Sequence, residues 1–528
     1  MKISLRHCGI VVTFCASAFS QVLTSQYDNQ RTGVTLNEKV LRRSNVNVKQ
    51  FGKLGAFKVD GAVYAQPLYL PSVEIPGKGT HNVFFVATEH DSVYAFDAEH
   101  PEHPPLWHVS FLDSKRGVGT TSADELQCPF IQPEVGVTST PAIDLRSGTL
   151  YVLARTEIRH HLASDEFFQH LHALAITTGV EKFGGPKLIT ASARGTGRGA
   201  ANGKVVFDPQ YENPRASLLL NNNVLYLTWA SSCDYGPYHG WVMAYDPQTL
   251  TQRAALNVTP DGEEGGIWES DTGPAADSEG NVYVATGNGT FNASKGGRDY
   301  GDSELKLTLH GTAFEIQDYF TPYDQARLND EDGDLGSSGP TVLPDQPGPH
   351  RHLLLQPGKG AELYIIDRDH MGKFNADGDA VVQRIRMKAG GYGAAAYWNG
   401  HVFFACEDDS LRDYAVTTKG QLVLNRRSKI EFENPGATPT VSANGDRDAI
   451  VWAVATRRWN GGEHNAVLYA FDANDVSQPI YTSEQNSKRD RAALATRFVV
   501  PVVVNGRVYF AARGEVEVYG LLPQNDPH

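Results

Sequence analysis

Short apolar strands alternate with polar turns along nearly the whole chain. The recurring unit is a Pro-led or small-residue apolar strand, a turn that often ends in Asn-Gly, a second apolar strand, another turn, and a strand that ends near Asp. Runs of Val, Tyr, Phe and Ala closed by such turns are typical of antiparallel hairpins. An apolar period of 3.6 residues does not persist for long, so we expect few helices.

This unit occurs eight times, with copies that begin near residues 65, 140, 217, 273, 339, 394, 438 and 500. A lone four-stranded sheet exposes both faces and both edges, whereas radial repetition about an axis leaves only short edges. The sequence therefore predicts an all-β fold, an eight-bladed β-propeller of four-stranded antiparallel blades. An array of two-sheet sandwiches is the alternative architecture.

We expect residues 21–528 to form this propeller as a single domain. The mature chain then has roughly 63 residues per blade, above the ~40 to 50 of minimal propeller repeats, and the excess must lie in loops. The longest predicted loops cover residues 99–135, 155–169, 180–213, 287–304 and 318–337. Loops of more than ~15 residues in a compact fold are usually functional, so several should cover one mouth of the axial channel.

Residues 1–20 have the pattern of an export signal. Lys2 and Arg6 precede an apolar run over residues 8–19, and the small residue Ser20 ends the segment. The run is too short for a membrane span, and no later stretch approaches the ~20 apolar residues that a span needs. We therefore expect a secreted or periplasmic protein without a membrane span.

The charge balance bears on the kind of partner. The chain has 47 Lys and Arg against 61 Asp and Glu, a formal net charge of −14. Nucleic-acid binding is driven by basic patches that release counterions, and a phosphate backbone would be repelled overall. Nucleic acid is therefore not an expected partner.

Three cysteines lie outside the predicted signal: Cys128, Cys233 and Cys406. At most one intramolecular disulfide can form among them. We predict the pair Cys128 with Cys233. The alternative is three free buried thiols that behave as small hydrophobes.

The repeated strand endings "VYAFDA", "LHALAITTG", "VMAYDP" and "LYAFDA" resemble the repeat of the pyrroloquinoline quinone (PQQ) quinoprotein dehydrogenases and their non-enzymatic relatives. The resemblance covers nearly the whole mature chain and implies the same propeller. In the enzymes of this family, PQQ sits over the channel with a calcium ion that a Glu, an Asn and the quinone hold. An Asp near the ion accepts the substrate proton, and a Lys or Arg contacts the quinone.

Four residues match these family positions. Glu157 in "LYVLARTE" and Asn288 in "ATGNGTFN" correspond to the residues that hold cofactor and calcium, and Lys359 in "PGKGAELYIIDRD" corresponds to the quinone-contacting base. Asp334 falls where the family's catalytic Asp stands, also beside the ion, and Asp332 is the alternative if the register slips by two. Neighbouring carboxylates such as those of Asp332 and Asp334 repel one another unless a cation binds between them. This also favours Ca²⁺ at this segment.

Each of these residues also has a purely structural interpretation. Glu157 would then be an exposed loop residue, and Asn288 a turn residue within a glycosylation sequon. Asp334 would belong to a solvated acidic loop, and Lys359 to a surface hairpin.

The sequence also departs from the family pattern around the cofactor. Gln127-Cys128 replaces the adjacent Cys pair that packs over the quinone, and the family Arg that follows this pair falls near Pro133. Thr272 stands nearest to the Trp that lies beneath the cofactor, with Trp268 a few residues earlier. The loss of the Cys pair and of the Trp removes most of the apolar and stacking surface on the two faces of the cofactor. Aromatic stacking is worth ~0.5 to 1.5 kcal/mol beyond area burial.

Two functions follow from these observations. The first is an oxidoreductase that uses PQQ and Ca²⁺ to oxidise a small-molecule alcohol or sugar hydroxyl, with Asp334 as general base. The second is a non-catalytic propeller that binds a protein or glycan at its loop-rich mouth. The matched residues motivate the first, and the departures motivate the second.

Overall fold

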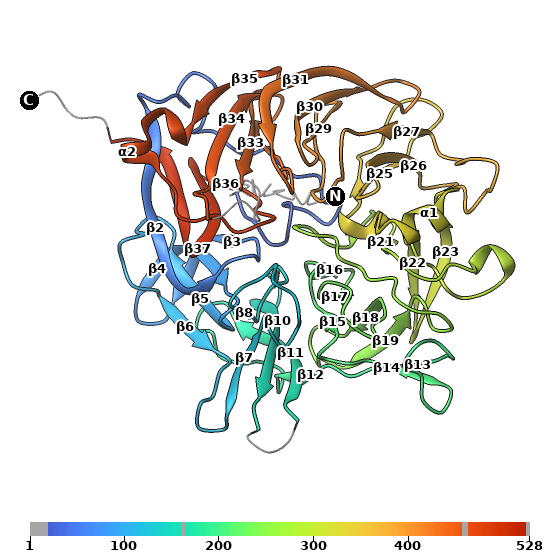
Figure 1. The fold of residues 1–528 in the computed structure, drawn as a ribbon. Helices are drawn as coiled ribbons and strands as arrows, with labels where there is room; N and C mark the ends of the chain where they lie inside the picture. The colour runs from blue at the N-terminus through green and yellow to red at the C-terminus, as the bar shows by residue number, and fades with distance from the viewer. Residues whose placement is uncertain (1–19, 161–163, 457–462, 524–528) are drawn as a thin grey trace, which may run out of the picture.

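The computed structural model describes residues 20–160, 164–456 and 463–523. The predicted signal peptide, residues 1–20, lies outside these ranges except for Ser20. The described residues form eight sheets of mostly antiparallel strands around a central axis (Figure 1). The predicted eight-bladed β-propeller is confirmed.

The first four blades follow the chain, each with its inner strand first. Blade 1 contains β3 (Leu68–Ile75), β4 (Gly79–Ala87), β5 (Ser92–Asp97) and β6 (Trp107–Ser110). Blade 2 contains β9 (Ala142–Asp144), β10 (Thr149–Ile158), β11 (Glu166–Ala175) and β12 (Lys187–Leu188), with β7 (Val118–Ser122) paired to β10 and β8 (Glu134–Val135) paired to β7. Blade 3 contains β16 (Leu219–Asn221), β17 (Val224–Ser231), β18 (Trp241–Tyr245) and β19 (Gln252–Asn257), with β15 (Glu212–Asn213) added beside β17. Blade 4 contains β20 (Ala275–Ala276), β21 (Val282–Ala285), β22 (Glu304–His310) and β23 (Ala313–Phe320).

Blades 5 to 7 repeat the same order. Blade 5 contains β24 (Thr341–Val342), β25 (Leu353–Gly358), β26 (Glu362–Asp367) and β27 (Gln383–Arg386). Blade 6 contains β28 (Ala396–Trp398), β29 (His401–Phe404), β30 (Asp409–Val416) and β31 (Leu422–Phe432). Blade 7 contains β32 (Thr440–Asn444), β33 (Arg447–Ala455), β34 (Val467–Asp472) and β35 (Asp475–Thr482), with β1 (Val34–Thr35) parallel to β32.

Blade 8 is built from both ends of the chain. Its inner strand β36 (Val502–Val504) pairs with the first residues of β37 (Arg507–Leu521), and the later residues of β37 pair with β2 (Phe51–Ala62). Gly514, with φ 74°, lies within the part of β37 that pairs with β2, where the register shifts between Lys58 and Ala62. The N-terminal strand β2 thus closes the ring, and the sequence pattern had not predicted it.

The segment before β2 reaches the inner strand of every blade. Val22 pairs with Tyr69 of blade 1, Asn29 Nδ2 donates to the Leu220 carbonyl of blade 3, and the Val503 N–H of blade 8 donates to the Tyr27 hydroxyl. In the other five blades, inner-strand N–H groups donate to the backbone of this segment: Ile143 to Leu23, Ala276 to Asn29, Val342 to Gln30, Tyr397 to Thr32 and Val441 to Gly33. The segment therefore fills the hub and links all the blades.

Apolar side chains pack between neighbouring blades. Between blades 8 and 1, the ring of Phe84 stacks on Tyr509 at 4.2 Å and on Phe57 at 5.6 Å, measured between ring centroids. All three side chains are fully or almost fully buried. Aromatic contacts of this kind add to the free energy gained by burying apolar area.

The long loops are partly strands in the structure. Residues 155–169 were predicted as a loop, but β10 runs to Ile158 and β11 begins at Glu166, so most of this segment is a hairpin. Its polar residues can lie in strands because they find partners, as Arg155 does when it donates to the Pro209 carbonyl at 2.9 Å. Residues 99–135 and 180–213 likewise contain short strands, among them the ribbon β13 (Ser192–Arg194) with β14 (Lys204–Val206).

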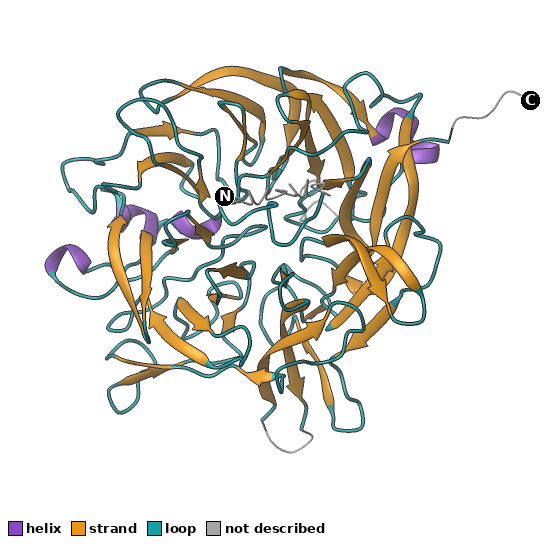
Figure 2. Cartoon of the chain, turned by 180° about the vertical axis from the view of Figure 1, so that it is seen from behind, coloured by secondary structure: helices purple, strands orange, loops and turns teal. Residues whose placement is uncertain are grey.

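Helices are few among the described residues, as predicted, and they are short (Figure 2). The described residues contain α1 (Gln325–Asp330) and α2 (Ser487–Asp490), with the 3-10 turns η1 (Ala293–Lys295), η2 (Leu335–Ser337) and η4 (Ser483–Asn486). A bilayer core requires ~20 apolar helical residues. None of the helices within the described ranges is long and apolar enough to cross a membrane.

Candidate functional site

A cavity of about 510 Å³ lies on the axis at the end where the inner strands begin. Trp268, Ser337, Tyr392 and Phe498 line it, and each shortly precedes the inner strand of its own blade. The predicted loops 99–135 and 318–337 also contribute lining residues. A volume of this size suits a small-molecule ligand.

Asp334 lines this cavity, and Asn288 lies beside it. The carboxyl Oδ1 of Asp334 accepts a hydrogen bond of 2.9 Å from the backbone N–H of Asn288. The side-chain Nδ2 of Asn288 donates to Asp332 Oδ1 at 3.1 Å, while its Oδ1 is buried without a hydrogen-bond partner. A Cβ at Gly287 would collide with Asp334 and with the ring of Trp268, so only glycine allows this approach.

Lys359 completes the group from the end of β25. Its Nζ lies 3.3 Å from Asp334 Oδ2 and also donates to Asp332. Although burial lowers it, the carboxylates of Asp334 and Asp332 raise the pKa of Lys359 above its usual range. The structure thus brings three of the four matched residues together.

Burial dominates the electrostatics of Asp334. It raises the pKa of the Asp334 carboxyl to about 7, although Lys359 lowers it, and Asp234 raises it further. A carboxyl with a pKa near neutrality can accept a proton at physiological pH, which is a property of general bases.

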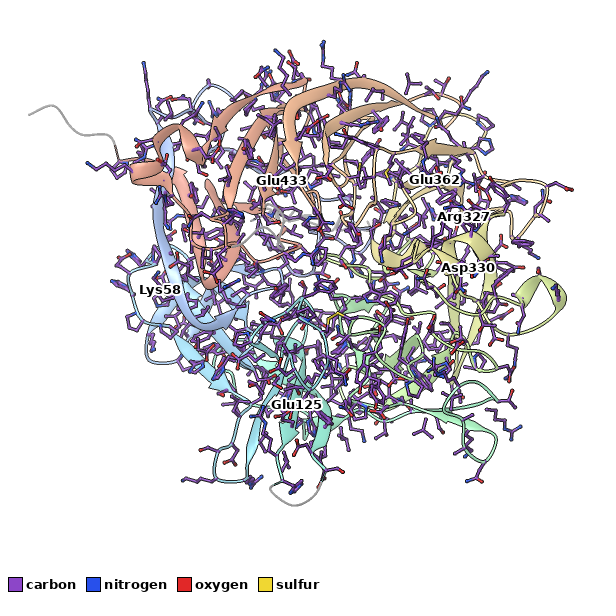
Figure 3. All side chains as sticks on the ribbon, in the orientation of Figure 1. Lys58, Glu125, Arg327, Asp330, Glu362 and Glu433 are labelled. Carbon is purple, nitrogen blue, oxygen red and sulfur yellow. A yellow bond between two sulfur atoms is a disulfide. The ribbon has the colours of Figure 1, made fainter. Side chains whose placement is uncertain are left out.

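Glu157 lies apart from this group. Its buried side chain projects from β10, accepts a hydrogen bond from Arg159, and is not among the residues that line the cavity. Arg159 also contacts Glu125, which Figure 3 places over the blade of β10, away from the axis. Its contacts are with Arg159 and Glu125 rather than with Asn288 or Asp334, and its Oε2 is buried without a hydrogen-bond partner.

Several charged or aromatic lining residues were not predicted as site residues from the sequence. Asp234 follows β17, and its Oδ1 accepts a 2.7 Å hydrogen bond from the Tyr238 hydroxyl. The guanidinium of Arg215 lies 4.8 Å from the centroid of the Phe498 ring and leaves its Nη2 buried without a hydrogen-bond partner. Arg497 lies 5.1 Å from the same ring, and Tyr392 lies opposite Phe498 with ring centroids 6.3 Å apart.

The position of these residues in the repeat was the available signal. Arg215, Arg497 and Tyr392 each stand shortly before the inner strand of a blade, as Ser337 does. Residues at this position line the cavity from several blades, whatever their type.

The predicted disulfide is confirmed. Cys128 and Cys233 are bonded, with Cα atoms 5.5 Å apart, and Cys406 is a buried free thiol. Figure 3 shows the bond in yellow near the middle of the ring. The bonded cysteines line the cavity, so the disulfide joins two of the loops that form its wall.

Trp268 also lines the cavity, edge-on to Tyr238 with ring centroids 6.0 Å apart. Thr272, which stands nearest to the family's Trp in the sequence, is buried outside the cavity lining. An aromatic ring is therefore present at the site, although it comes from an earlier position.

No family model and no curated protein matches the sequence. Among solved structures, the quinohemoprotein alcohol dehydrogenase ADHIIG from Pseudomonas putida HK5 is similar over 96% of this chain and 82% of its own, with a TM-score of 0.60 and 15% identity. A europium-containing methanol dehydrogenase is similar over 95% of this chain and 98% of its own, with a TM-score of 0.57 and 12% identity. The chain therefore has the propeller fold of the quinoprotein alcohol dehydrogenases, as the repeat predicted.

Proposed function

We propose that this protein is a quinoprotein-type dehydrogenase that oxidises an alcohol or sugar hydroxyl with PQQ and Ca²⁺ bound in the axial cavity. The observation that carries the proposal is the buried Asp334 carboxyl, which is held by the Asn288 N–H and by Lys359 at a cavity of small-molecule size. A buried carboxyl with a pKa raised to about 7 at a cavity is a candidate functional group.

The residues present fit a calcium ion. Ca²⁺ takes six to eight oxygen ligands, including carboxylate and amide oxygens. The Oδ1 of Asn288 is buried without a partner, and Asp334 lies next to it. Asp234 also lines the cavity and raises the pKa of Asp334, so it replaces Glu157 as the second carboxylate in our proposal.

The cavity walls fit a planar anionic quinone. Trp268, Tyr392 and Phe498 offer aromatic surface, and Arg215 and Arg497 offer positive charge. The buried Arg215 Nη2 has a free N–H for an anionic group. Arginine is suited to carboxylates because its planar fork can bind both oxygens.

In the reaction, Asp334 accepts the proton of the substrate hydroxyl. Lys359 favours the ionised form of Asp334, and the Asn288 N–H holds the carboxyl in place. When bound, PQQ with Ca²⁺ would supply the two-electron acceptor for the hydride of the substrate carbon, which would become an aldehyde, ketone or lactone carbonyl, and an external oxidant such as the assay dye would take up the electrons. Asp334 must then release its proton to solvent before the next turnover.

Export belongs to the proposal. Residues 1–20 would be removed as a signal peptide, and residues 21–528 would form the propeller as one domain in the periplasm or outside the cell.

The decisive experiment is calorimetric titration of the purified protein with PQQ in the presence of Ca²⁺, together with dye-linked oxidation of a panel of alcohols and sugars. We expect binding that is lost in Asn288→Ala and turnover that is lost in Asp334→Asn. Asp330→Asn is the matched control, because Asp330 is an exposed carboxylate at the end of the nearby helix α1 (Figure 3).

The departures from the family pattern favour one competing function, a non-catalytic propeller that binds protein or glycan. Absence of heat, of a thermal shift and of oxidation in the same assays would reject the dehydrogenase in its favour. Binding of PQQ without turnover of any substrate would retain the cavity assignment and reject Asp334 as the base.

A further inference from the structure

A second group of metal-ligating side chains lies in the loop between β5 and β6 of blade 1. The ligand atoms of His100, Glu102 and His103 all lie within 4.8 Å of one another. Glu102 Oε1 is 3.1 Å from His100 Nδ1 and 3.7 Å from His103 Nε2. The two imidazole rings stack with centroids 4.7 Å apart and an interplanar angle of 17°.

The backbone holds these three residues in place. The His103 N–H donates to the His100 carbonyl at 3.0 Å, and the His100 N–H donates to the Asp97 carbonyl at 3.1 Å, so the loop makes two successive turns. Pro101, between the ligands, fixes its own φ and packs against Gly55 of β2, where a Cβ would lie 2.9 Å from its Cγ.

The loop is also tied to blade 8. Arg507 of β37 donates to the Ala98 carbonyl at 2.7 Å and to the Glu99 carbonyl at 3.1 Å. Little of the loop therefore needs to become ordered when a ligand binds, which lowers the entropic cost of binding.

The donor set selects the class of ion. Two imidazole nitrogens and one carboxylate oxygen suit Zn²⁺ or Cu²⁺, whereas Ca²⁺ and Mg²⁺ require mostly oxygen ligands. The three side chains are 49%, 64% and 59% exposed, so an ion can reach them without a conformational change. Three protein ligands leave a coordination position open for water.

We propose that His100, Glu102 and His103 form a surface site that binds one divalent transition-metal ion, Zn²⁺ or Cu²⁺. The site is separate from the axial cavity and does not depend on the proposed dehydrogenase function. Because its loop packs on β2 and β37, the bound ion also stabilises the contact between blades 1 and 8, where the ring closes. Any ion that binds only the folded state raises the free energy of unfolding.

The test is calorimetric titration of the metal-free, untagged protein with ZnCl₂, followed by thermal unfolding with and without Zn²⁺. We expect one equivalent bound and a higher melting temperature. Removing a residue that only hydrogen-bonds to a metal ligand typically weakens metal binding roughly 10- to 100-fold. Because His100→Ala and His103→Ala each remove a ligand itself, we expect at least that loss of Zn²⁺ affinity in each variant. Electron paramagnetic resonance of the Cu²⁺ form should show coupling to two nitrogens in the wild type and to one in each variant.

His352→Ala is the matched control. Its imidazole is also partly exposed and lies 2.8 Å from Asp369 and 3.8 Å from Asp345, but it belongs to blade 5 and has no second histidine in its group. This variant should bind Zn²⁺ like the wild type. The proposal is overturned if the wild type binds no Zn²⁺ in the micromolar range. It is also overturned if the double variant, His100→Ala with His103→Ala, still binds one equivalent of Zn²⁺.

Discussion

The ammonium of Lys359 lies 3.3 Å from the carboxyl of Asp334, and it is the positive charge that most strongly opposes the effect of burial on that carboxyl. An opposite charge at this distance typically lowers a carboxyl pKa by roughly 1 to 3 units. Lys359 therefore keeps the pKa of Asp334 near 7 rather than higher.

Removing this charge should move the pH dependence of the proposed oxidation. In Lys359→Met, Asp334 loses its cation, so a larger share of the enzyme carries a protonated base at neutral pH. We expect the rising limb of the dye-linked rate against pH to shift upward by roughly one unit or more.

The control is Lys388→Met, which removes an exposed lysine that follows β27 of blade 5 and pairs with Glu431 of blade 6 at 3.1 Å. Its rate profile should match the wild type. An unchanged midpoint in Lys359→Met would show that Asp334 is not the group whose ionisation limits the rate.

The disulfide should hold two walls of the cavity together. Cys128 and Cys233 are 105 residues apart and join the loop after β7 to the loop after β17. Native disulfides typically contribute roughly 2 to 4 kcal/mol to the free energy of unfolding. We expect Cys128→Ser with Cys233→Ser to lose about that much in urea unfolding and to bind PQQ more weakly.

The control Cys406→Ala distinguishes the effect of losing the cross-link from the effect of losing a cysteine side chain. Cys406 is a buried free thiol in blade 6, so its removal leaves both cavity loops joined. This variant should retain the PQQ affinity of the wild type. Equal affinity in the double serine variant would show that the loops keep their positions without the bond.

The propeller could be predicted because its sequence signal is repeated. Eight copies of one strand pattern identify the blades even where a single boundary is wrong, as it is for residues 155–169. Strand β2 has no copy of this pattern around it, and its partner β37 lies at the opposite end of the chain. Local patterns cannot reveal such a pairing.

The candidate site was predicted in part for a related reason. Asn288, Asp334 and Lys359 each follow or precede a strand at the same end of a blade, so closing the ring brings them together. Asp234 and Arg215 stand at equivalent ends of blade 3, but their residue types do not repeat from blade to blade. Which of the axial residues face one another depends on the conformations of the loops, and the strand repeat does not encode these.

Arg31 is the residue through which the hub segment contacts two blades at once. Its fully buried guanidinium donates to the Pro274 carbonyl at 3.0 Å and to the Leu218 carbonyl at 3.3 Å. Arg31→Met would leave these carbonyls buried without partners, at a cost of roughly 2 to 3 kcal/mol in the free energy of unfolding. Urea unfolding followed by tryptophan fluorescence measures this loss.

Arg43→Met provides the comparison, because Arg43 makes an exposed ion pair of 2.9 Å with Asp472. Exposed pairs contribute about 0 to 1 kcal/mol, so its midpoint should barely change. Equal losses in the free energy of unfolding of the two variants would show that the hub contact of Arg31 stabilises the fold no more than an exposed ion pair does.

Glu269 should make the stability of the protein depend on pH. It is fully buried, its Oε1 accepts a 3.0 Å hydrogen bond from the Ala285 N–H, and its Oε2 has no partner. Burial raises the pKa of this carboxyl from 4.5 to about 8, more than Ala285 and Arg31 lower it. The folded state therefore holds a proton that the unfolded state releases above pH 4.5.

A carboxyl with a raised pKa in the folded state contributes stability that is complete below its unfolded value and is lost as the pH rises toward 8. Glu269→Gln keeps an oxygen for the Ala285 N–H but does not titrate. The variant should therefore gain stability relative to the wild type from pH 5 upward, by roughly 3 kcal/mol at pH 7. Urea midpoints of the wild type, Glu269→Gln and the exposed control Glu331→Gln, measured from pH 4 to pH 8, test this. Parallel curves for all three would mean that Glu269 is ionised in the folded protein, with a cation or water at its free oxygen.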